Sequence, residues 1–175
     1  MSIKFGPIFH VGYAVPVMDR ALDYWTNVLG VGPFFVERHV TGRDEAYIYR
    51  GKPCEQDVTV AHAFTGDMDI ELICPNIWKP SPVVDYLELH PRGGVQHFGV
   101  LIGDWDATMK RPEVQERLVL EGHAGTIRIA FVDSYALGAP ALELIEANDE
   151  TRRKLGYLKK MCAEWDGRDP IRGKK

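Results

Sequence analysis

The chain has 175 residues, enough to bury the core of one domain, and its 45% hydrophobic and 26% charged residues are typical of a globular protein. With 21 basic and 25 acidic side chains the net charge is −4, which argues against a nucleic-acid partner or an anionic membrane surface. The three scattered cysteines, an N-terminus without an apolar signal core and the absence of an apolar run of about 20 residues predict a protein of the cytoplasm.

The first half of the chain predicts the order strand, helix, strand, strand, strand. Residues 8–15 are rich in β-branched and aromatic side chains, which favour a strand, and Pro16 ends it. A helix is expected at about 19–29, because Asp19 can cap its start and Gly30 its end. Three more strands are expected. The first lies at about 34–40 and the third at 68–74. The second lies at 46–50, or is slightly longer, and is taken together with 57–64.

The second half is compatible with the same order. A strand at 95–102 is followed by a helical stretch at about 104–121, which Pro112 must start or kink. Strands are then expected near 126–132 and 140–146. Outside this repeated order, we expect a short helix near 83–89, an amphipathic helix from Asn148 onward and a loosely ordered end from Asp166. The apolar stripe of the amphipathic helix consists of Leu155, Leu158, Met161, Cys162 and Trp165.

Two short motifs occur twice along the chain, in the same order. Segments 9–15 and 96–102 each contain a His, one further residue, a Gly and then an apolar run. Segments 70–76 and 142–148 each contain Glu-Leu-Ile after an aliphatic residue, with an Asn three positions beyond the Ile. Recurrence of this kind indicates a duplicated structural unit.

We therefore predict an α+β fold in one domain that comprises residues 1–175. The domain is divided into module one, module two and a C-terminal helical tail, at about 7–78, 94–148 and 149–166. Module one has the order βαβββ, and module two is compatible with it.

Each module contributes one histidine and one glutamate at the repeated positions, namely His10, Glu71, His97 and Glu143. Neither predicted strand that contains these glutamates has a Lys or Arg, so burial of each carboxylate requires compensation by a cation. Two neutral imidazoles and two carboxylates balance a divalent ion, and this donor set suits Zn, Ni, Co, Mn or Fe. A lone histidine or glutamate would more often be a core or surface residue, so the prediction depends on the repeat of both.

His62 is a separate case, because it lies in the predicted strand 57–64 on the same face as Val60 and Phe64. It could line a pocket, but a hydrogen-bonded core histidine is the interpretation that this pattern favours.

Several segments together resemble the vicinal oxygen chelate superfamily, which includes glyoxalase I, methylmalonyl-CoA epimerase, extradiol dioxygenases and bleomycin-resistance proteins. The segments are 9–16, 25–34, 70–73, 94–98 and 142–145. The resemblance is closest to the glyoxalase I and epimerase branch. It implies two βαβββ modules that form a curved, barrel-like mixed sheet around one divalent metal ion. The ligands that it implies are His10, Glu71, His97 and Glu143.

The function that this resemblance implies is a metal-dependent isomerase or lyase that shifts a proton beside the carbonyl of a small-molecule substrate. Glu143 or Glu71 could act as the base, as in glyoxalase-type chemistry. Glu55 lies near the position of an epimerase base, although residues 49–53 depart from the epimerase pattern. The alternatives are a non-catalytic small-molecule-binding protein of the same fold and an Fe(II) ring-cleaving dioxygenase. A homodimer is possible, because related proteins often pair modules across chains.

Overall fold

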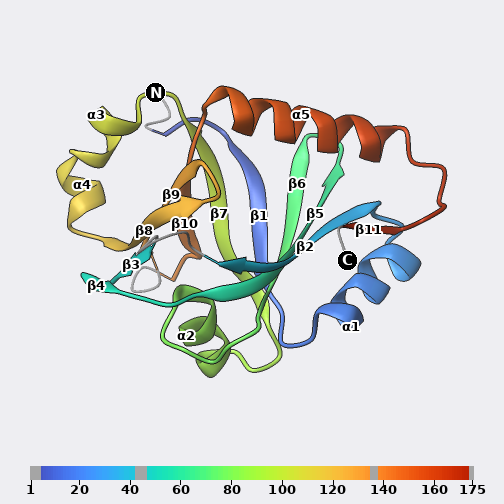
Figure 1. Cartoon of the computed structure of the whole chain (residues 1–175), viewed down its shortest axis with the longest axis horizontal. Coiled ribbons are helices and arrows are strands. Elements are labelled where there is room, and N and C mark those ends of the chain that lie inside the picture. Colours follow the sequence, from blue (N-terminus) through green and yellow to red (C-terminus); the bar gives the residue numbers. More distant parts are fainter. Residues whose placement is uncertain (1–4, 42–46, 135–137, 174–175) are drawn as a thin grey trace.

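The computed structural model describes residues 5–41, 47–134 and 138–173, which form one curved eleven-stranded sheet with helices around it (Figure 1). The strands are β1 (Ile8–Ala14), β2 (Phe34–Thr41), β3 (Tyr47–Tyr49), β4 (Lys52–Pro53), β5 (Asp57–Thr65), β6 (Met68–Pro75), β7 (Gly94–Ile102), β8 (Leu118–Ala124), β9 (Ile127–Val132), β10 (Ala141–Glu146) and β11 (Ile171–Gly173). The helices are α1 (Met18–Asp23) with its π-helical continuation η1 (Tyr24–Val28), α2 (Pro82–Leu89), α3 (Trp105–Met109), α4 (Pro112–Gln115) and α5 (Asp149–Ala163). The predicted α+β fold with a mixed sheet and a C-terminal helix is confirmed.

The two halves of the sheet have the same strand order. In module one, β1 is parallel to β6, and β6, β5 and β2 follow as antiparallel neighbours. In module two, β7 is parallel to β10, and β10, β9 and β8 follow in the same way. The first strands of the two modules, β1 and β7, pair antiparallel at the centre of the sheet. The four central strands are therefore β6, β1, β7 and β10.

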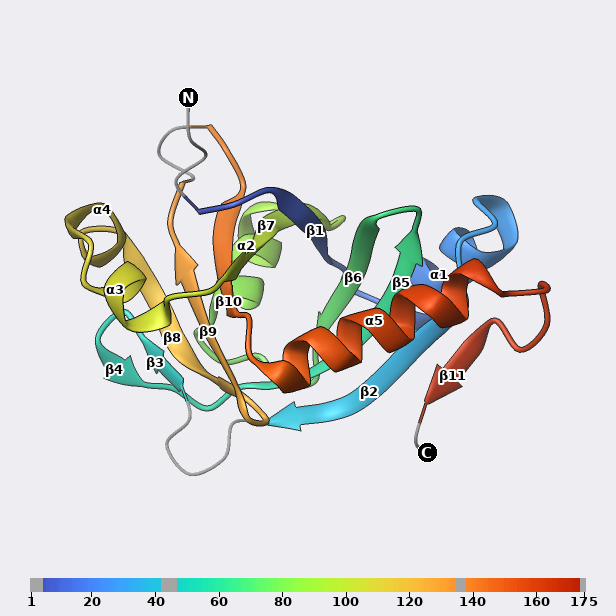
Figure 2. The same cartoon turned by 90° about the horizontal axis from the view of Figure 1, so that it is seen from above.

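The alternation of side chains along these strands separates a helix-packed face from the opposite face. Leu72 and Leu144 are fully buried, in clusters that include residues of α1 and of α3 and α4 respectively. Their neighbours Glu71 and Glu143 point to the other face, because successive strand residues alternate. Glu71 and Glu143 line one cavity together with residues of β5, β9 and α5, so they lie on the concave side of the sheet, whose curvature Figure 2 shows.

Three elements outside the repeated pattern complete the concave side. Strands β3 and β4 follow β2 in the chain, yet they cross to the far edge of the sheet, where β3 pairs with β8. Helix α5 runs across module one and packs against β5 (Figures 1 and 2). Of its predicted apolar stripe, Leu158 is 4% exposed and the other four residues are partly buried.

Three local predictions were wrong. The helical stretch predicted at about 104–121 ends at Gln115. Residues 118–124 instead form β8, which pairs with both β9 and β3. The end of the chain is not loose throughout, since β11 pairs with β2. Asp19 does not cap α1, because the helix begins one residue earlier, at Met18, and places Asp19 in its first turn.

Within the described residues, no helix has both the length and the apolar character needed to cross a membrane.

Candidate metal centre

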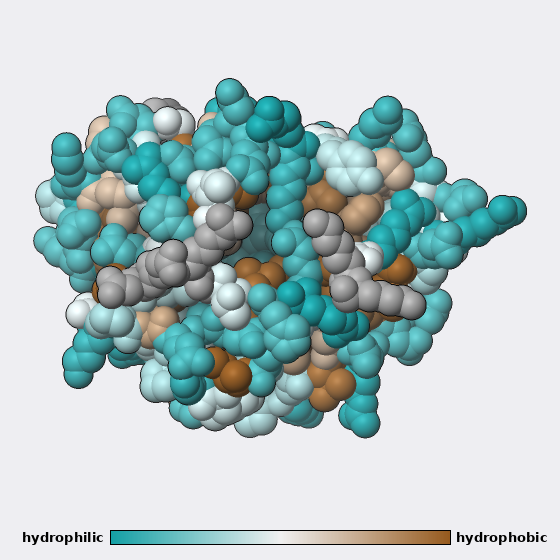
Figure 3. Space-filling model, in the orientation of Figure 1, coloured by the Kyte–Doolittle hydropathy of each residue, from teal (hydrophilic) through white to brown (hydrophobic). Residues whose placement is uncertain are grey.

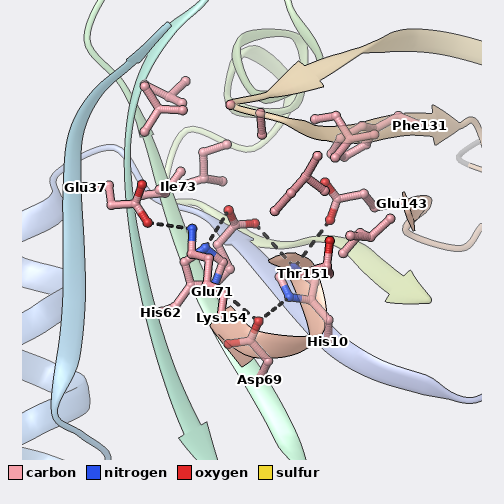
Figure 4. A pocket seen from close by; sticks show the side chains of 18 of the residues that line it. His10, Glu37, His62, Asp69, Glu71, Ile73, Phe131, Glu143, Thr151 and Lys154 are labelled. Carbon is pink, nitrogen blue, oxygen red and sulfur yellow. Dashed lines mark hydrogen bonds and ion pairs between the residues drawn. The ribbon is translucent and has the colours of Figure 1, made fainter. Parts of the chain in front are cut away.

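The four repeated residues meet on the concave face, one from each central strand. His10 lies on β1, Glu71 on β6, His97 on β7 and Glu143 on β10, and all four are at most 8% exposed. One donor atom from each lies within 4.8 Å of the donor atoms of the others. Figure 4 shows the side chains of His10, Glu71 and Glu143 converging at one end of a cavity. The structure therefore brings together the four residues that the sequence repeat singled out.

The spacing between the donor atoms suits a shared cation. Nε2 of His97 lies 2.9 Å from Nε2 of His10, 3.1 Å from Oε2 of Glu71 and 3.4 Å from Oε2 of Glu143. Nε2 of His10 lies 3.4 Å and 3.7 Å from the same two carboxylate oxygens. Ligands bound at about 2.0–2.2 Å to one ion lie roughly 3.0–3.4 Å apart when its geometry is octahedral or tetrahedral.

Each imidazole is oriented by a hydrogen bond on the far side of its ring. Nδ1–H of His10 donates to Oδ2 of Asp69 at 2.8 Å, and Nδ1–H of His97 donates to Oε1 of Gln96 at 2.5 Å. A proton on Nδ1 leaves the lone pair of Nε2 available as a ligand, which is the usual arrangement for metal-binding histidines. Two such lone pairs that face each other at 2.9 Å require a proton or a cation between them.

The repeated glycines explain how both rings reach the centre. In the β1–β7 register, Gly12 lies opposite His97 and Gly99 lies opposite His10. A Cβ atom on Gly12 would lie 1.9 Å from Cε1 of His97, and one on Gly99 would lie 2.8 Å from Cδ2 of His10. Each His-x-Gly motif therefore supplies one imidazole of the cluster and the space for the imidazole of the other module.

The electrostatics of the cluster follow from burial and mutual pairing. Burial disfavours the charged imidazole of His10, but the hydrogen bond to Asp69 and the contact with Glu71 outweigh it and raise its pKa well above the usual value. The pKa of His97 is also raised, because its contacts with Glu143 and Glu71 outweigh burial. The pKa of Glu71 is well below its usual value, since its bonds to His10 and His97 exceed the effect of burial. Without a metal ion, the cluster therefore holds protons that a divalent cation would displace.

Three residues of the cluster, His10, Glu71 and Glu143, line a cavity of about 260 Å³. The rest of the wall is largely apolar and consists of residues such as Val58, Val60, Ile73, Val83, Ile127, Ile129 and Phe131. Helix α5 contributes Thr151, Lys154, Leu155 and Leu158 to the wall, and Figure 3 shows the surface hollowed just below this helix. An apolar cavity with a few converging polar groups is typical of a small-molecule site.

Glu55 is not brought to this cluster. Its side chain is 68% exposed, forms an ion pair with Lys79 and does not line the cavity. Its role as a base stays a prediction from sequence, which the geometry of the cavity does not support.

Four further residues belong to the site, of which the sequence analysis missed three and interpreted one, His62, mainly as a core residue. Asp69 and Gln96 orient the two ligand histidines, and Glu37 and His62 line the cavity. Asp69 precedes Glu71 by two residues on one strand, so the strand period could have placed it on the ligand face. His62 lines the cavity and also donates from Nδ1–H to Asp69 at 3.2 Å, so both interpretations of this residue hold.

The sequence model of the glyoxalase, bleomycin resistance protein and dioxygenase superfamily matches residues 9–131. No curated protein is significantly similar to the chain.

Solved structures resemble the fold at low sequence identity. A methylmalonyl-CoA epimerase from Mycobacterium tuberculosis has 20% identity and a TM-score of 0.55, over 83% of this chain and 91% of that one. The Streptomyces coelicolor methylmalonyl-CoA epimerase in complex with 2-nitronate-propionyl-CoA has 18% identity and a TM-score of 0.53, over 83% and 97%. A hypothetical protein from Bacillus halodurans has 17% identity and a TM-score of 0.57, over 82% and 95%.

Proposed function

Because the chain belongs to the glyoxalase, bleomycin resistance protein and dioxygenase superfamily, we propose that it is a metal-dependent isomerase or lyase that moves a proton beside a substrate carbonyl. The observation that carries the proposal is the convergence of two imidazoles and two carboxylates beside a small, mostly apolar cavity, which His10, Glu71 and Glu143 line. One divalent ion, of Zn, Ni, Co, Mn or Fe, would be held by His10, Glu71, His97 and Glu143.

A divalent ion in this position would polarise a substrate carbonyl and so acidify the adjacent C–H bond. The chain supplies the remaining parts of the reaction. Asp69 and Gln96 hold the two imidazoles in one orientation, so little reorganisation accompanies each turnover. The apolar wall excludes water from the carbon that loses its proton.

Glu143 is the residue that we propose to move the proton. Glu71 contacts three imidazoles, those of His10, His97 and His62. Glu143 contacts only His97 and His10, at 3.4 Å and 3.7 Å, and each distance is longer than that of Glu71 to the same ring. Its cross-strand neighbour on β9 is the apolar Phe131. A carboxylate with fewer partners and an apolar neighbour is the freer of the two to exchange a proton with a substrate.

Two of the structurally similar proteins are methylmalonyl-CoA epimerases, which supports proton transfer beside an acyl carbonyl as the class of reaction. The cavity of about 260 Å³ is smaller than most ligand sites, so it would hold the reacting group of a substrate rather than a whole coenzyme A ester.

The test is hydrogen–deuterium exchange at carbon in D₂O, followed by NMR, with the Co²⁺-loaded protein. The probes are methylmalonyl-CoA and the hemithioacetal of methylglyoxal and glutathione. We expect metal-dependent exchange with at least one of these probes. Glu143→Gln should lower the exchange rate at least about 100-fold, the usual contribution of a general base, and leave the circular dichroism spectrum unchanged. Glu121→Gln, at an exposed glutamate of β8, is the matched control and should keep full activity.

Two other outcomes would replace this proposal. Retention of exchange by Glu143→Gln would mean that another group moves the proton. Absence of exchange in a protein that binds Co²⁺ would favour a non-catalytic binding protein, or a ring-cleaving dioxygenase if Fe(II) supports oxygen uptake with a catechol. Homodimer formation stays a prediction, which sedimentation velocity measures directly.

A further inference from the structure

Strand β3 carries two tyrosines on one face, and only one of their hydroxyl groups has a hydrogen-bond partner. The hydroxyl of Tyr49 donates to Oδ2 of Asp85 at 2.5 Å and accepts from Nε–H of Arg50 at 2.9 Å. Tyr47 is 2% exposed, and within the part of the chain that the structure describes its hydroxyl makes no hydrogen bond. A buried phenol usually has a partner, so the hydroxyl of Tyr47 is an exception that requires an explanation.

The strand register places Tyr47 on the same face of the sheet as Glu143. Across the strands, Tyr47 lies opposite Gly122 on β8, which lies opposite Ile129 on β9. Ile129 in turn lies opposite Ile145 on β10. Ile145 and Glu143 are two residues apart on one strand, so they share a face. All of these residues except Gly122 line the cavity, and Tyr47 therefore belongs to the same wall as Glu143.

The hydroxyl of Tyr47 is open to the cavity. Among the side chains that the structure describes, the one polar atom that is both fully buried and without a partner is Oδ1 of Asp69. The hydroxyl of Tyr47 also lacks a partner, so it must keep some accessible surface, and the cavity is the space that this side chain lines. Burial, and then the charge of Glu143, raise the pKa of Tyr47 to about 12, so the hydroxyl keeps its proton at neutral pH and can donate.

This donor lies in a part of the wall that is otherwise apolar. The neighbouring lining residues from β9 are Ile127, Ile129 and Phe131, whose side chains offer no hydrogen bond. On the other edge of the sheet the place of β3 is taken by β11, Ile171–Gly173, which does not line the cavity. A polar group in apolar surroundings costs free energy unless it is paired, and a bound molecule is the partner that the cavity can supply for Tyr47.

We propose that Tyr47 contacts the substrate, and that its hydroxyl donates a hydrogen bond to a substrate oxygen on the side of the centre where Glu143 lies. The bond pairs the donor that the fold leaves unpaired, and it holds the substrate in one position beside Glu143. This inference rests on the metal centre and the cavity of the proposed function but not on the reaction assigned to them.

The experiment compares two small chelators that bind a divalent ion in the same way. Oxalate and acetohydroxamate each chelate through two oxygens in a five-membered ring. Oxalate directs two further oxygens away from the ion, whereas acetohydroxamate directs a methyl group and an N–H away from it. Only oxalate therefore offers a hydrogen-bond acceptor beyond the ion. Titration of Co²⁺-loaded protein, followed by the visible absorption of Co²⁺, gives the dissociation constant of each chelator.

Tyr47→Phe removes the hydroxyl and keeps the ring. It should weaken oxalate at least about tenfold, or about 1.4 kcal/mol, which is within the contribution of a hydrogen bond to a charged acceptor. The affinities for acetohydroxamate and for Co²⁺ should be nearly unchanged. Tyr49→Phe is the matched control on the same strand, because its hydroxyl is bound to Asp85 and does not line the cavity, and it should change neither chelator.

A second measurement separates a contact with the ligand from a structural role. In the parent protein, oxalate should shift the tyrosine absorption band to longer wavelength. Tyr47→Phe should lose this shift and Tyr49→Phe should keep it. If Tyr47→Phe does not fold, absence of the shift in the parent protein overturns the inference without the variant.

Equal weakening of both chelators by Tyr47→Phe would overturn the inference, because the residue would then only support the shape of the site. Unchanged oxalate binding in this variant, or an equal loss in Tyr49→Phe, would do the same. Failure of the parent protein to bind Co²⁺ would remove the metal centre and this inference together. A selective loss of oxalate binding in a protein that exchanges no carbon-bound hydrogen would support the inference and overturn only the proposed reaction.

Discussion

At the residue scale, the glycines matter as much as the ligands. The His-x-Gly motif is repeated because β1 and β7 pair antiparallel, which sets the glycine of each motif against the histidine of the other. Any side chain at Gly12 would occupy the space of the His97 ring. The motif therefore records a steric requirement of the pairing as well as a ligand position.

Gly12→Ala should displace His97 and weaken Co²⁺ binding at least tenfold, because loss of a correctly oriented ligand or of its support typically costs that much. Gly103→Ala is the control, since a Cβ atom there meets nothing within 4 Å. Equilibrium dialysis with Co²⁺ measures both. Equal affinity in the two variants would contradict the steric argument.

The pKa shifts of the ligands predict how the metal-free protein responds to pH. The folded-state pKa values of His10 and His97 lie above the value of about 6.5 in an unfolded chain. Their contribution to stability is therefore complete below pH 6.5 and is lost as the pH rises through the raised values.

Metal-free protein should accordingly have a lower free energy of unfolding at pH 9 than at pH 6.5, as measured by urea denaturation. With saturating Co²⁺ the order should reverse, because protons compete with the metal for the same nitrogens. A metal-free protein whose stability rises with pH over this interval would show that the imidazoles are neutral in the fold.

The convergence of the four residues that we propose as ligands could be predicted from the sequence, because duplication placed the same residue types at the same positions twice. The residues that orient the two imidazoles could not be predicted in the same way, because the acceptor is Asp69 for His10 and Gln96 for His97, two different residue types at different positions. Asp69 has Ala141 as its counterpart across the parallel strands, and the imidazole of His97 relies on its chain neighbour instead. Such differences are invisible to an argument from repetition.

At the element scale, secondary-structure elements outside the two repeated modules contribute to the wall of the cavity. Helix α5 packs against β5 and lines the cavity with Leu158, a residue that the apolar stripe of the helix had indicated. The path of β3 and β4 to the edge of module two was not predictable, because local pattern does not report which edge a short strand joins. Strand β8 was missed because Val114 and Leu118 are four residues apart, a spacing that also suits a helix.

Leu158→Ala should lower the free energy of unfolding by about 2 kcal/mol or more, because it removes a buried side chain from the contact between α5 and the sheet. Lys159→Ala, next to it on the exposed side of the helix, should change stability by less than about 0.5 kcal/mol. Thermal denaturation of both variants makes the comparison. Equal effects would mean that α5 does not anchor through its apolar stripe.

At the scale of the whole molecule, the metal centre that we propose lies where the two halves of the sheet meet. Its ligands come from four adjacent strands, two from each module, so an ion would join the modules in addition to the β1–β7 pairing. The overall architecture was predictable from the sequence, because duplication and strand periodicity together determine the order of the elements. The differences between the modules beside the cluster were not predictable, because they are single substitutions between the copies, such as His62 in one and Phe131 in the other.

Saturation with Co²⁺ at about 100 times its dissociation constant should stabilise the whole domain by about 2.7 kcal/mol in one cooperative transition. Calorimetry with and without EDTA measures this difference. Two separate transitions, only one of them sensitive to metal, would show that the ion does not join the halves.

The most direct test of the metal centre is an anomalous difference map from crystals grown with Co²⁺ and measured at the cobalt absorption edge. We predict one strong peak within about 2.0–2.3 Å of Nε2 of His10, Nε2 of His97 and a carboxylate oxygen of both Glu71 and Glu143. A peak at any other position, or none in a crystal whose solution sample binds cobalt, would contradict the account.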